Sequence, residues 1–157
     1  MLLHSCPEMV AFESLVRPLH FLHFVAGITS LASCVHLLLR LVRRRHDPRV
    51  RTHATVLGLA YLATFTLGTL IYPTFRVRVR AELLDKTYPW ATGLFEIKEH
   101  AASIVLIPVL AIFLLSRTLD LKQKPEALLV GGLASVVLLV LFYNACVGWY
   151  LGTIRSV

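Results

Sequence analysis

Histidines recur inside an otherwise apolar stretch of the chain, residues 20–36, which reads HFLHFVAGITSLASCVH. The histidines of this stretch, together with those at the start of two later apolar runs, are His20, His23, His36, His53 and His100. Imidazole is the commonest metal ligand in proteins, and it also accepts and releases protons near neutral pH. An ionisable side chain inside a membrane span is costly, so each of these histidines is a candidate for ligand binding or proton transfer.

The composition places these histidines in a membrane protein. Of the 157 residues, 57% are hydrophobic and only 16% are Asp, Glu, Lys or Arg, whereas soluble domains have about 25% charged residues. The formal net charge is +7, and the basic residues flank apolar runs, where such residues orient a chain on anionic lipid. The predicted partner is therefore the lipid bilayer and not a nucleic acid.

Four apolar runs have the length of roughly 20 residues that a helix needs to cross a bilayer. They cover about 18–42, 53–75, 99–116 and 126–152. Because the connections are short, neighbouring helices are predicted to be antiparallel. The predicted fold is an all-α integral membrane protein, an up-down bundle of four transmembrane helices over residues 18–157. Residues 1–17 are predicted to form a short N-terminal interfacial helix, with Pro18 in the first turn of the first span.

The connection 76–98 is long for a helical bundle. Its first part, RVRVR, alternates like a strand, whereas the following AELLDK is typical of one or two helical turns. We expect Tyr88, Pro89 and Trp90 to anchor the connection at the membrane interface. Because loops carry function more often than cores do, this connection either covers the mouth of the bundle or binds a ligand there.

The distribution of basic residues predicts the orientation of the bundle, since short basic loops stay in the cytoplasm. Residues 40–51 hold six arginines and one acid, and residues 117–126 add three basic residues. The opposite side carries seven basic residues. The prediction is a bacterial inner-membrane protein with loop 40–51 in the cytoplasm and both termini outside.

This topology pairs the histidines at two levels of the bundle. His100 is predicted to open the third span at the same end as His20 and His23, and His23 is the better partner because it lies about one turn deeper. His36 and His53 are predicted to meet at the opposite end. Each level then offers two imidazoles from two helices, an arrangement that suits haem iron in electron transfer.

With four spans and these histidine pairs, the sequence resembles the small four-helix membrane b-type cytochromes. The resemblance implies one or two haem b groups, electron transfer across or into the membrane, a quinone as exchange partner, and other membrane or redox subunits as partners. The ligands that it implies are His23 with His100 and His36 with His53, with Arg40 and Arg44 near the propionates of the inner haem. His20 and His23 precede His36 by sixteen and thirteen residues, which turns each away from His36 by roughly 140–160° around a helix. A single haem is therefore the alternative.

A second set of ionisable residues suggests other functions. Glu96 and His100 are four residues apart and share a helix face. With Glu99 and a histidine of the first span, His20 or His23, they could bind a metal ion or relay protons, as in a transporter. The two acids would otherwise complement the positive end of the helix dipole. In a further alternative the chain is a non-catalytic small subunit of a larger complex, and its histidines serve packing. The sequence shows no nucleotide-binding loop or hydrolase motif, so the enzyme class left open is an oxidoreductase.

Overall fold

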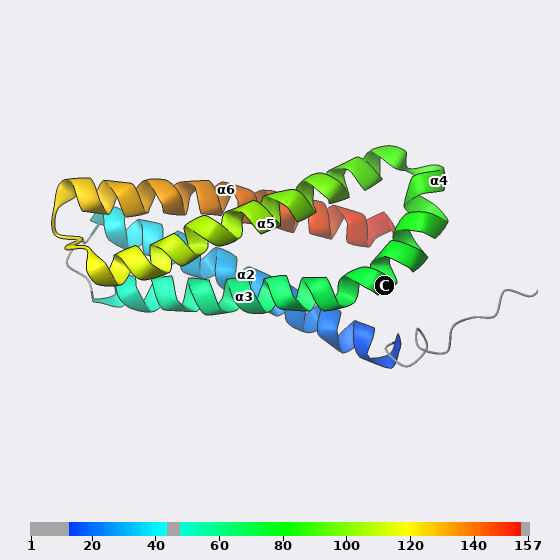
Figure 1. Ribbon diagram of the computed structural model, residues 1–157, viewed down its shortest axis with the longest axis horizontal. Helices are drawn as coiled ribbons and strands as arrows, with labels where there is room; N and C mark the ends of the chain where they lie inside the picture. Colours follow the sequence, from blue (N-terminus) through cyan, green and yellow to red (C-terminus); the bar gives the residue numbers. More distant parts are fainter. Residues whose placement is uncertain (1–12, 44–47, 155–157) are drawn as a thin grey trace, which may run out of the picture.

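Four long helices build the protein in a computed structural model that describes residues 13–43 and 48–154, with side chains from residue 15 onward (Figure 1). The helices are α2 (Glu13–Arg43), α3 (Arg49–Phe75), α5 (Pro89–Thr118) and α6 (Lys124–Ile154). All four are long and apolar enough to cross a membrane, and the span that contains α3 continues to Thr87. The described residues contain no strand. The predicted all-α fold with four candidate spans is therefore confirmed.

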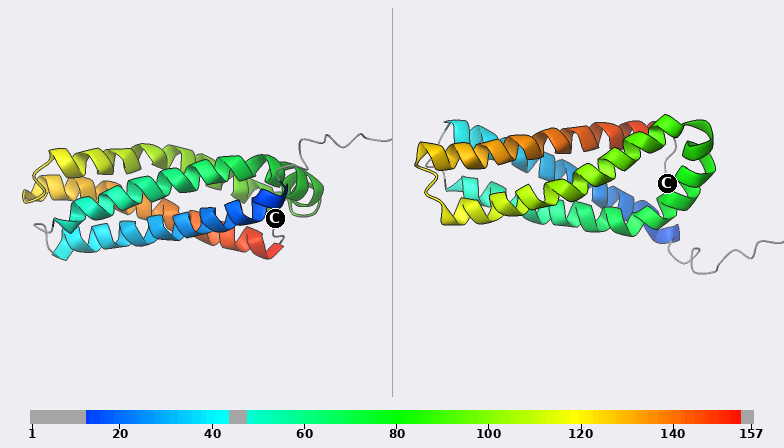
Figure 2. Two further views of the ribbon diagram at one scale, coloured as in Figure 1. Left: turned by 90° about the horizontal axis from the view of Figure 1, so that it is seen from below. Right: turned by 45° about the horizontal axis from the view of Figure 1, so that its top comes forward.

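The helices pack as a ring of four. α2 contacts α3, α3 contacts α5, α5 contacts α6, and α6 returns to α2. Both views in Figure 2 show the short turn 119–123 at one end of the bundle and the connection between α3 and α5 at the other. We call the first of these the loop end. The second is the α4 end, named after the short helix α4 (Asp85–Thr87).

The first span begins earlier than its apolar run predicts. α2 begins at Glu13, so residues 13–17 form its first turns and Pro18 lies inside the helix. Glu, Leu and Arg are good helix formers, which lets the helix continue past the edge of the apolar run. Residues 1–12, the rest of the predicted interfacial helix, lie outside the described residues.

The third span also begins earlier. α5 begins at Pro89, where the fixed φ of proline suits the first helical residue, and not near residue 99. The prediction that His100 opens this helix is therefore wrong, because the four polar residues among 96–100 interrupt the apolar run without interrupting the helix. Lys98, which the charge count assigns to a connection, is a helical residue for the same reason.

The connection from α3 to α5 is helical. α3 passes directly into η1 (Arg76–Leu84), a π-helix, and then into α4 before α5 begins. The wider turns of a π-helix bring residues five apart onto one face, and Val79 and Leu84 are both buried. The strand-like interpretation of RVRVR is wrong. A strand here would have no partner, whereas a helix pairs its own backbone groups, as a chain in a membrane must.

Two separate apolar clusters fill the bundle. The larger lies toward the loop end and includes the fully buried side chains of Leu37, Leu57, Ile112 and Val137. The smaller lies at the α4 end, where η1 packs against α5 and α6. Its buried members are Val79, Leu84, Ala91, Phe95, Val147 and Leu151. The clusters share no residue, so the apolar interior is interrupted between them.

Hydrogen bonds from side chains to backbone carbonyls connect neighbouring helices. Tyr61 Oη on α3 donates to the carbonyl of Ala102 on α5 over 2.6 Å. At the loop end, Arg51 Nε donates to the carbonyl of Ser116 over 3.2 Å. Because lipid is as apolar as a leucine side chain, helices in a membrane depend on close packing and on such bonds more than on hydrophobic burial.

Candidate intramembrane polar site

Lys98 lies on the buried face of α5. Residues seven apart lie on nearly the same face of a helix. Lys98 is seven residues from both Ala91 and Val105, whose exposed fractions are 0% and 2%. Its side chain is half-buried. The seven-residue spacing was the sequence signal for this residue, and the late predicted start of the helix concealed it.

His23 occupies the equivalent position on α2. It is seven residues from both Val16 and Ser30, which are buried. Its Nδ1 lies 2.8 Å from the carbonyl oxygen of Thr64 on α3. A carbonyl only accepts hydrogen bonds, so Nδ1 carries the proton of the neutral ring and Nε2 keeps its lone pair. Nε2 is therefore the atom of His23 that can accept a proton or bind a metal.

Asn144 on α6 reaches the same region. It is seven residues from the buried Val137 and Leu151. Its side-chain oxygen is buried and has no hydrogen-bond partner among the described residues. One turn further along α6, a Cβ built on Gly148 would lie 3.7 Å from Lys98 Cε and 3.9 Å from Nζ. Lys98 therefore packs against α6 at Gly148, one turn from Asn144.

These residues form one layer of the bundle. His23, Lys98 and Asn144 each lie twenty residues from the loop end of their helix, which is about 30 Å along the axis. Since helices of this length are about 45 Å long, the layer lies inside the spans, between the two apolar clusters. We call it the polar layer and include the two glycines that contact it, Gly68 and Gly148.

Gly68 of α3 makes room for His23. A Cβ at this position would lie 3.1 Å from His23 Cε1 and 3.4 Å from Nδ1. The first of these distances is shorter than ordinary van der Waals contact between carbon atoms. Any larger residue would therefore push the imidazole away from the Thr64 carbonyl.

Positive charge characterises the polar layer. The Lys98 ammonium acts electrostatically on both His20 and His23, and Glu99 is its neighbour of opposite sign. Among the described residues, no carboxylate forms an ion pair with Lys98. An unpaired charge inside a membrane span is costly.

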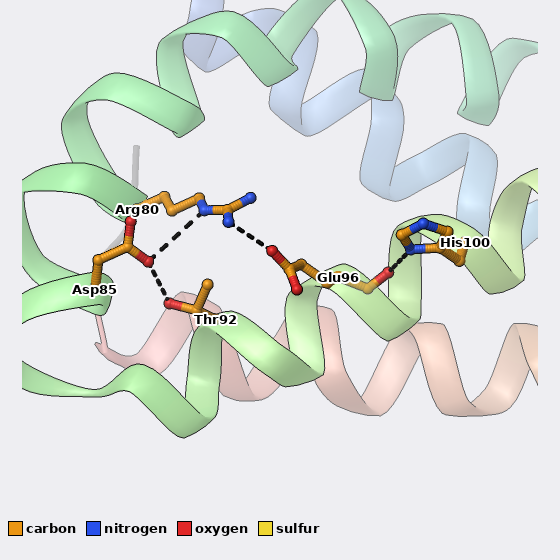
Figure 3. A network of polar contacts seen from close by, with 5 residues as sticks. All are labelled: Arg80, Asp85, Thr92, Glu96 and His100. Carbon is orange, nitrogen blue, oxygen red and sulfur yellow. Dashed lines mark hydrogen bonds and ion pairs between the residues drawn. The ribbon is translucent and has the colours of Figure 1, made fainter.

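A network of polar contacts connects α5 to the η1–α4 segment (Figure 3). Arg80 Nη2 donates to Glu96 Oε1 over 2.5 Å, and Arg80 Nε lies 3.7 Å from Asp85 Oδ1. Thr92 Oγ1 donates to the same Asp85 oxygen over 2.8 Å. The carboxylate of Glu96 therefore pairs with Arg80.

His100 does not meet His23. Its Nδ1 lies 2.7 Å from the backbone carbonyl oxygen of Glu96, one turn earlier, and its side chain is exposed (Figure 3). In the part of the chain that the structure describes, no hydrogen bond or ring contact joins His100 to His23. Within the same residues no group of three or more His, Cys, Asp or Glu side chains is arranged to hold a metal ion. Metal binding by His20, Glu96, Glu99 or His100 stays a prediction.

His36 and His53 lie together toward the loop end, at the level that the topology predicts. Their ring centroids are 5.3 Å apart and their planes differ by 24°, so the two imidazoles stack face to face. The lone pair of an imidazole nitrogen lies in the ring plane, so rings stacked in this way do not point at one iron from opposite sides. The pair does not fit a bis-histidine haem as arranged, and haem ligation stays a prediction. Of the predicted propionate partners, Arg40 is half-buried and interacts with another group, and Arg44 lies outside the described residues.

Comparisons with known proteins add no functional residue. No protein-family model matches the chain, and searches of curated proteins and of solved structures found no match. The polar layer and the contact between His36 and His53 are therefore the features of the chain that indicate a function.

Proposed function

We propose that this membrane protein transfers protons, and that the polar layer and the histidines of α2 form its relay. The observation that carries the proposal is the position of Lys98, on the buried face of α5 at the level of His23 and without an ion-paired carboxylate among the described residues. An apolar side chain would pack there at lower cost. Ionisable residues that face the interior of a membrane bundle are typical of proton and ion pathways.

The side chains of the layer suit a stepwise proton transfer. Lys98 Nζ releases a proton and keeps the electron pair, and His23 Nε2 accepts that proton. The resulting imidazolium passes a proton to water or to His20, which is exposed about one turn closer to the α4 end. Each step moves one proton between nitrogen or oxygen atoms, and the same route works in the opposite direction.

Polar side chains also continue along α2 toward the loop end. Ser30 and Ser33 are 0% and 6% exposed, and His36, stacked on His53, follows three residues later. Ser30 lies about 10 Å along the helix from His23, a gap that bridging water would have to close. The remaining interior at this level is apolar. This part of the route is therefore its slowest section.

In the proposed orientation the α4 end faces the outside of a bacterial inner membrane and the loop end faces the cytoplasm. Support comes from the basic residues of 40–51 and 117–126, because short basic loops are retained inside. Protons then reach the polar layer from the outside. In this proposed orientation the described ends of α2 and α6, at Glu13 and Ile154, face the outside.

Proton movement into proteoliposomes tests the proposal. The purified protein is reconstituted with a pH-sensitive dye inside, and a potassium gradient with valinomycin drives protons inward. We expect the wild type to acidify the lumen, and Lys98→Met to slow this by about tenfold or more, because it removes a proton-accepting group. Lys124→Met is the matched control, since Lys124 is exposed at the start of α6.

A pair of histidine variants separates the relay from a general loss of charge. His23→Gln keeps a polar side chain but removes the titratable ring, so we expect slow acidification. His100→Gln makes the same change at an exposed position outside the layer, and we expect the wild-type rate. Equal rates for the wild type, Lys98→Met and His23→Gln would refute the proposal.

The b-type cytochrome assignment is a second candidate, because His36 and His53 lie next to each other on two neighbouring helices. These two residues would hold the haem, which supplies one-electron chemistry, but their stacked rings would first have to turn apart. Reduced-minus-oxidised spectra of the wild type, His36→Ala and His53→Ala test this candidate. Loss of the same haem component in both variants would support it, and unchanged spectra would exclude this pair as ligands.

A further inference from the structure

We infer that the polar layer binds the carboxylate group of an organic anion between Lys98 and Asn144. The inference rests on the proposed proton-transfer site and adds the class of ligand that the site takes. Two independent observations support it, one on α5 and one on α6.

Lys98 supplies the positive charge for such a ligand. Its ammonium has three hydrogen-bond donors, and no described residue forms a hydrogen bond or ion pair with them. The neighbouring Glu99 acts on it electrostatically but belongs to the same helix and leaves those donors unpaired. Inside a membrane span, an ammonium in this state is stabilised by an anion that enters the layer.

Asn144 supplies a second group. Its buried side-chain oxygen has no partner among the described residues, whereas nearly all buried polar groups in folded proteins are paired. The oxygen and nitrogen ends of a side-chain amide exchange places by a half-turn, so Asn144 can present its NH₂ group to the layer. A carboxylate would then accept hydrogen bonds from Lys98 Nζ and Asn144 Nδ2, one for each oxygen.

The surroundings of these two groups indicate the rest of the ligand. Gly148 places no side chain against Lys98, and a Cβ there would come within 3.7 Å of Cε. On the α4 side, the ring of Phe95 lies 5.7 Å from Lys98 Nζ, measured to its centroid, and belongs to the smaller apolar cluster with Val147. An aromatic or aliphatic monocarboxylate matches this combination of a charged layer and an apolar neighbour.

Fluorine NMR of 4-fluorobenzoate tests the inference with the purified full-length protein in detergent. The signal of the probe broadens when it binds, and 4-fluorobenzamide, similar in shape but uncharged, is the matched ligand control. We expect the wild type to bind the benzoate and not the benzamide. Lys98→Met should weaken binding roughly tenfold to a hundredfold, because it removes a charged donor, and Lys124→Met should leave binding unchanged.

Two further variants keep the test decisive if Lys98→Met does not fold. Asn144→Asp places a carboxylate beside Lys98 and should abolish benzoate binding without removing the lysine. Asn144→Leu should weaken benzoate binding but contains every titratable group of the proton relay. Benzoate binding that is absent from the wild type, or equal in the wild type and Asn144→Asp, would overturn the inference.

The carboxylate can come from water or from the membrane. Displacement of 4-fluorobenzoate by laurate would support the site with a lipid carboxylate as ligand, whereas displacement by unlabelled benzoate alone would support it with a soluble one. The proton assay separates this inference from the proposed function. If Lys98→Met slows proton movement while benzoate does not bind, the carboxylate site is refuted and the relay stands.

Discussion

Replacing Gly68 with alanine tests the polar layer at one defined contact. The added Cβ would lie 3.1 Å from His23 Cε1 and 3.4 Å from Nδ1. Because both atoms belong to a ring held on the Thr64 carbonyl at 2.8 Å, relief of the contact requires either a rotation of the ring or a separation of α2 from α3. Either movement lengthens the hydrogen bond between His23 and Thr64.

Three effects set the size of the expected change in the free energy of unfolding. Alanine is better than glycine in a helix interior by about 1 kcal/mol. Overpacking costs about 1–3 kcal/mol, and loss of one hydrogen bond costs about 0.5–1.5 kcal/mol. Gly68→Ala should therefore destabilise the protein by roughly 0.5–3.5 kcal/mol. Gly132→Ala, where nothing lies within 4 Å of the added Cβ, should stabilise it by up to about 1 kcal/mol.

Equilibrium unfolding in mixed detergent micelles measures both values. The double variant His23→Ala, Gly68→Ala removes the ring that the new Cβ would contact. In it the Gly68 substitution should be neutral or stabilising, like Gly132→Ala. If Gly68→Ala stabilises the protein in the presence of His23, or destabilises it equally without His23, the packing of His23 against Gly68 is not as described.

Three other predictions concern the bundle around the layer. Tyr61→Phe removes the 2.6 Å hydrogen bond from α3 to α5 and should lower the free energy of unfolding in micelles by about 0.6–1.7 kcal/mol; no change would contradict the bond. Arg80→Met removes half-exposed ion pairs and should lower the free energy of unfolding by no more than about 1 kcal/mol. Amide hydrogen exchange in residues 76–84 should nevertheless become faster, and unchanged exchange would show that Arg80 does not hold this segment in place. In variants without native cysteines, Lys86→Cys should react with an impermeant maleimide added outside cells and Lys122→Cys should not; the opposite result would reverse the orientation.

The position of a residue along the bundle axis could be predicted from the sequence, because it depends only on helix lengths and on short connections. His36 and His53 flank a short turn, and this forced them to the same end of two neighbouring helices, where they do stack. The lengths of the four apolar runs predicted the bundle in the same way.

The faces that residues occupy were harder to predict, because each residue turns a helix by about 100°. Lys98 and His100 are two residues apart, so they project about 200° apart and only one of them can face the interior. Ala91 and Val105, seven residues before and after Lys98, are buried, which indicates that Lys98 is the residue that faces the interior. Ala91 belongs to the same helix as Lys98 only because that helix begins at Pro89.

Nitrogen-15 NMR of the lysine side chains tests the central claim most directly, namely that Lys98 exchanges protons inside the span. The chain has four lysines, Lys86, Lys98, Lys122 and Lys124, and Lys98→Met assigns the signal of interest. The three other lysines are exposed and provide reference signals. The account predicts that Lys98 titrates with a midpoint of its own, and that His23→Gln moves this midpoint while His100→Gln does not. A Lys98 midpoint that His23→Gln leaves unchanged would contradict it.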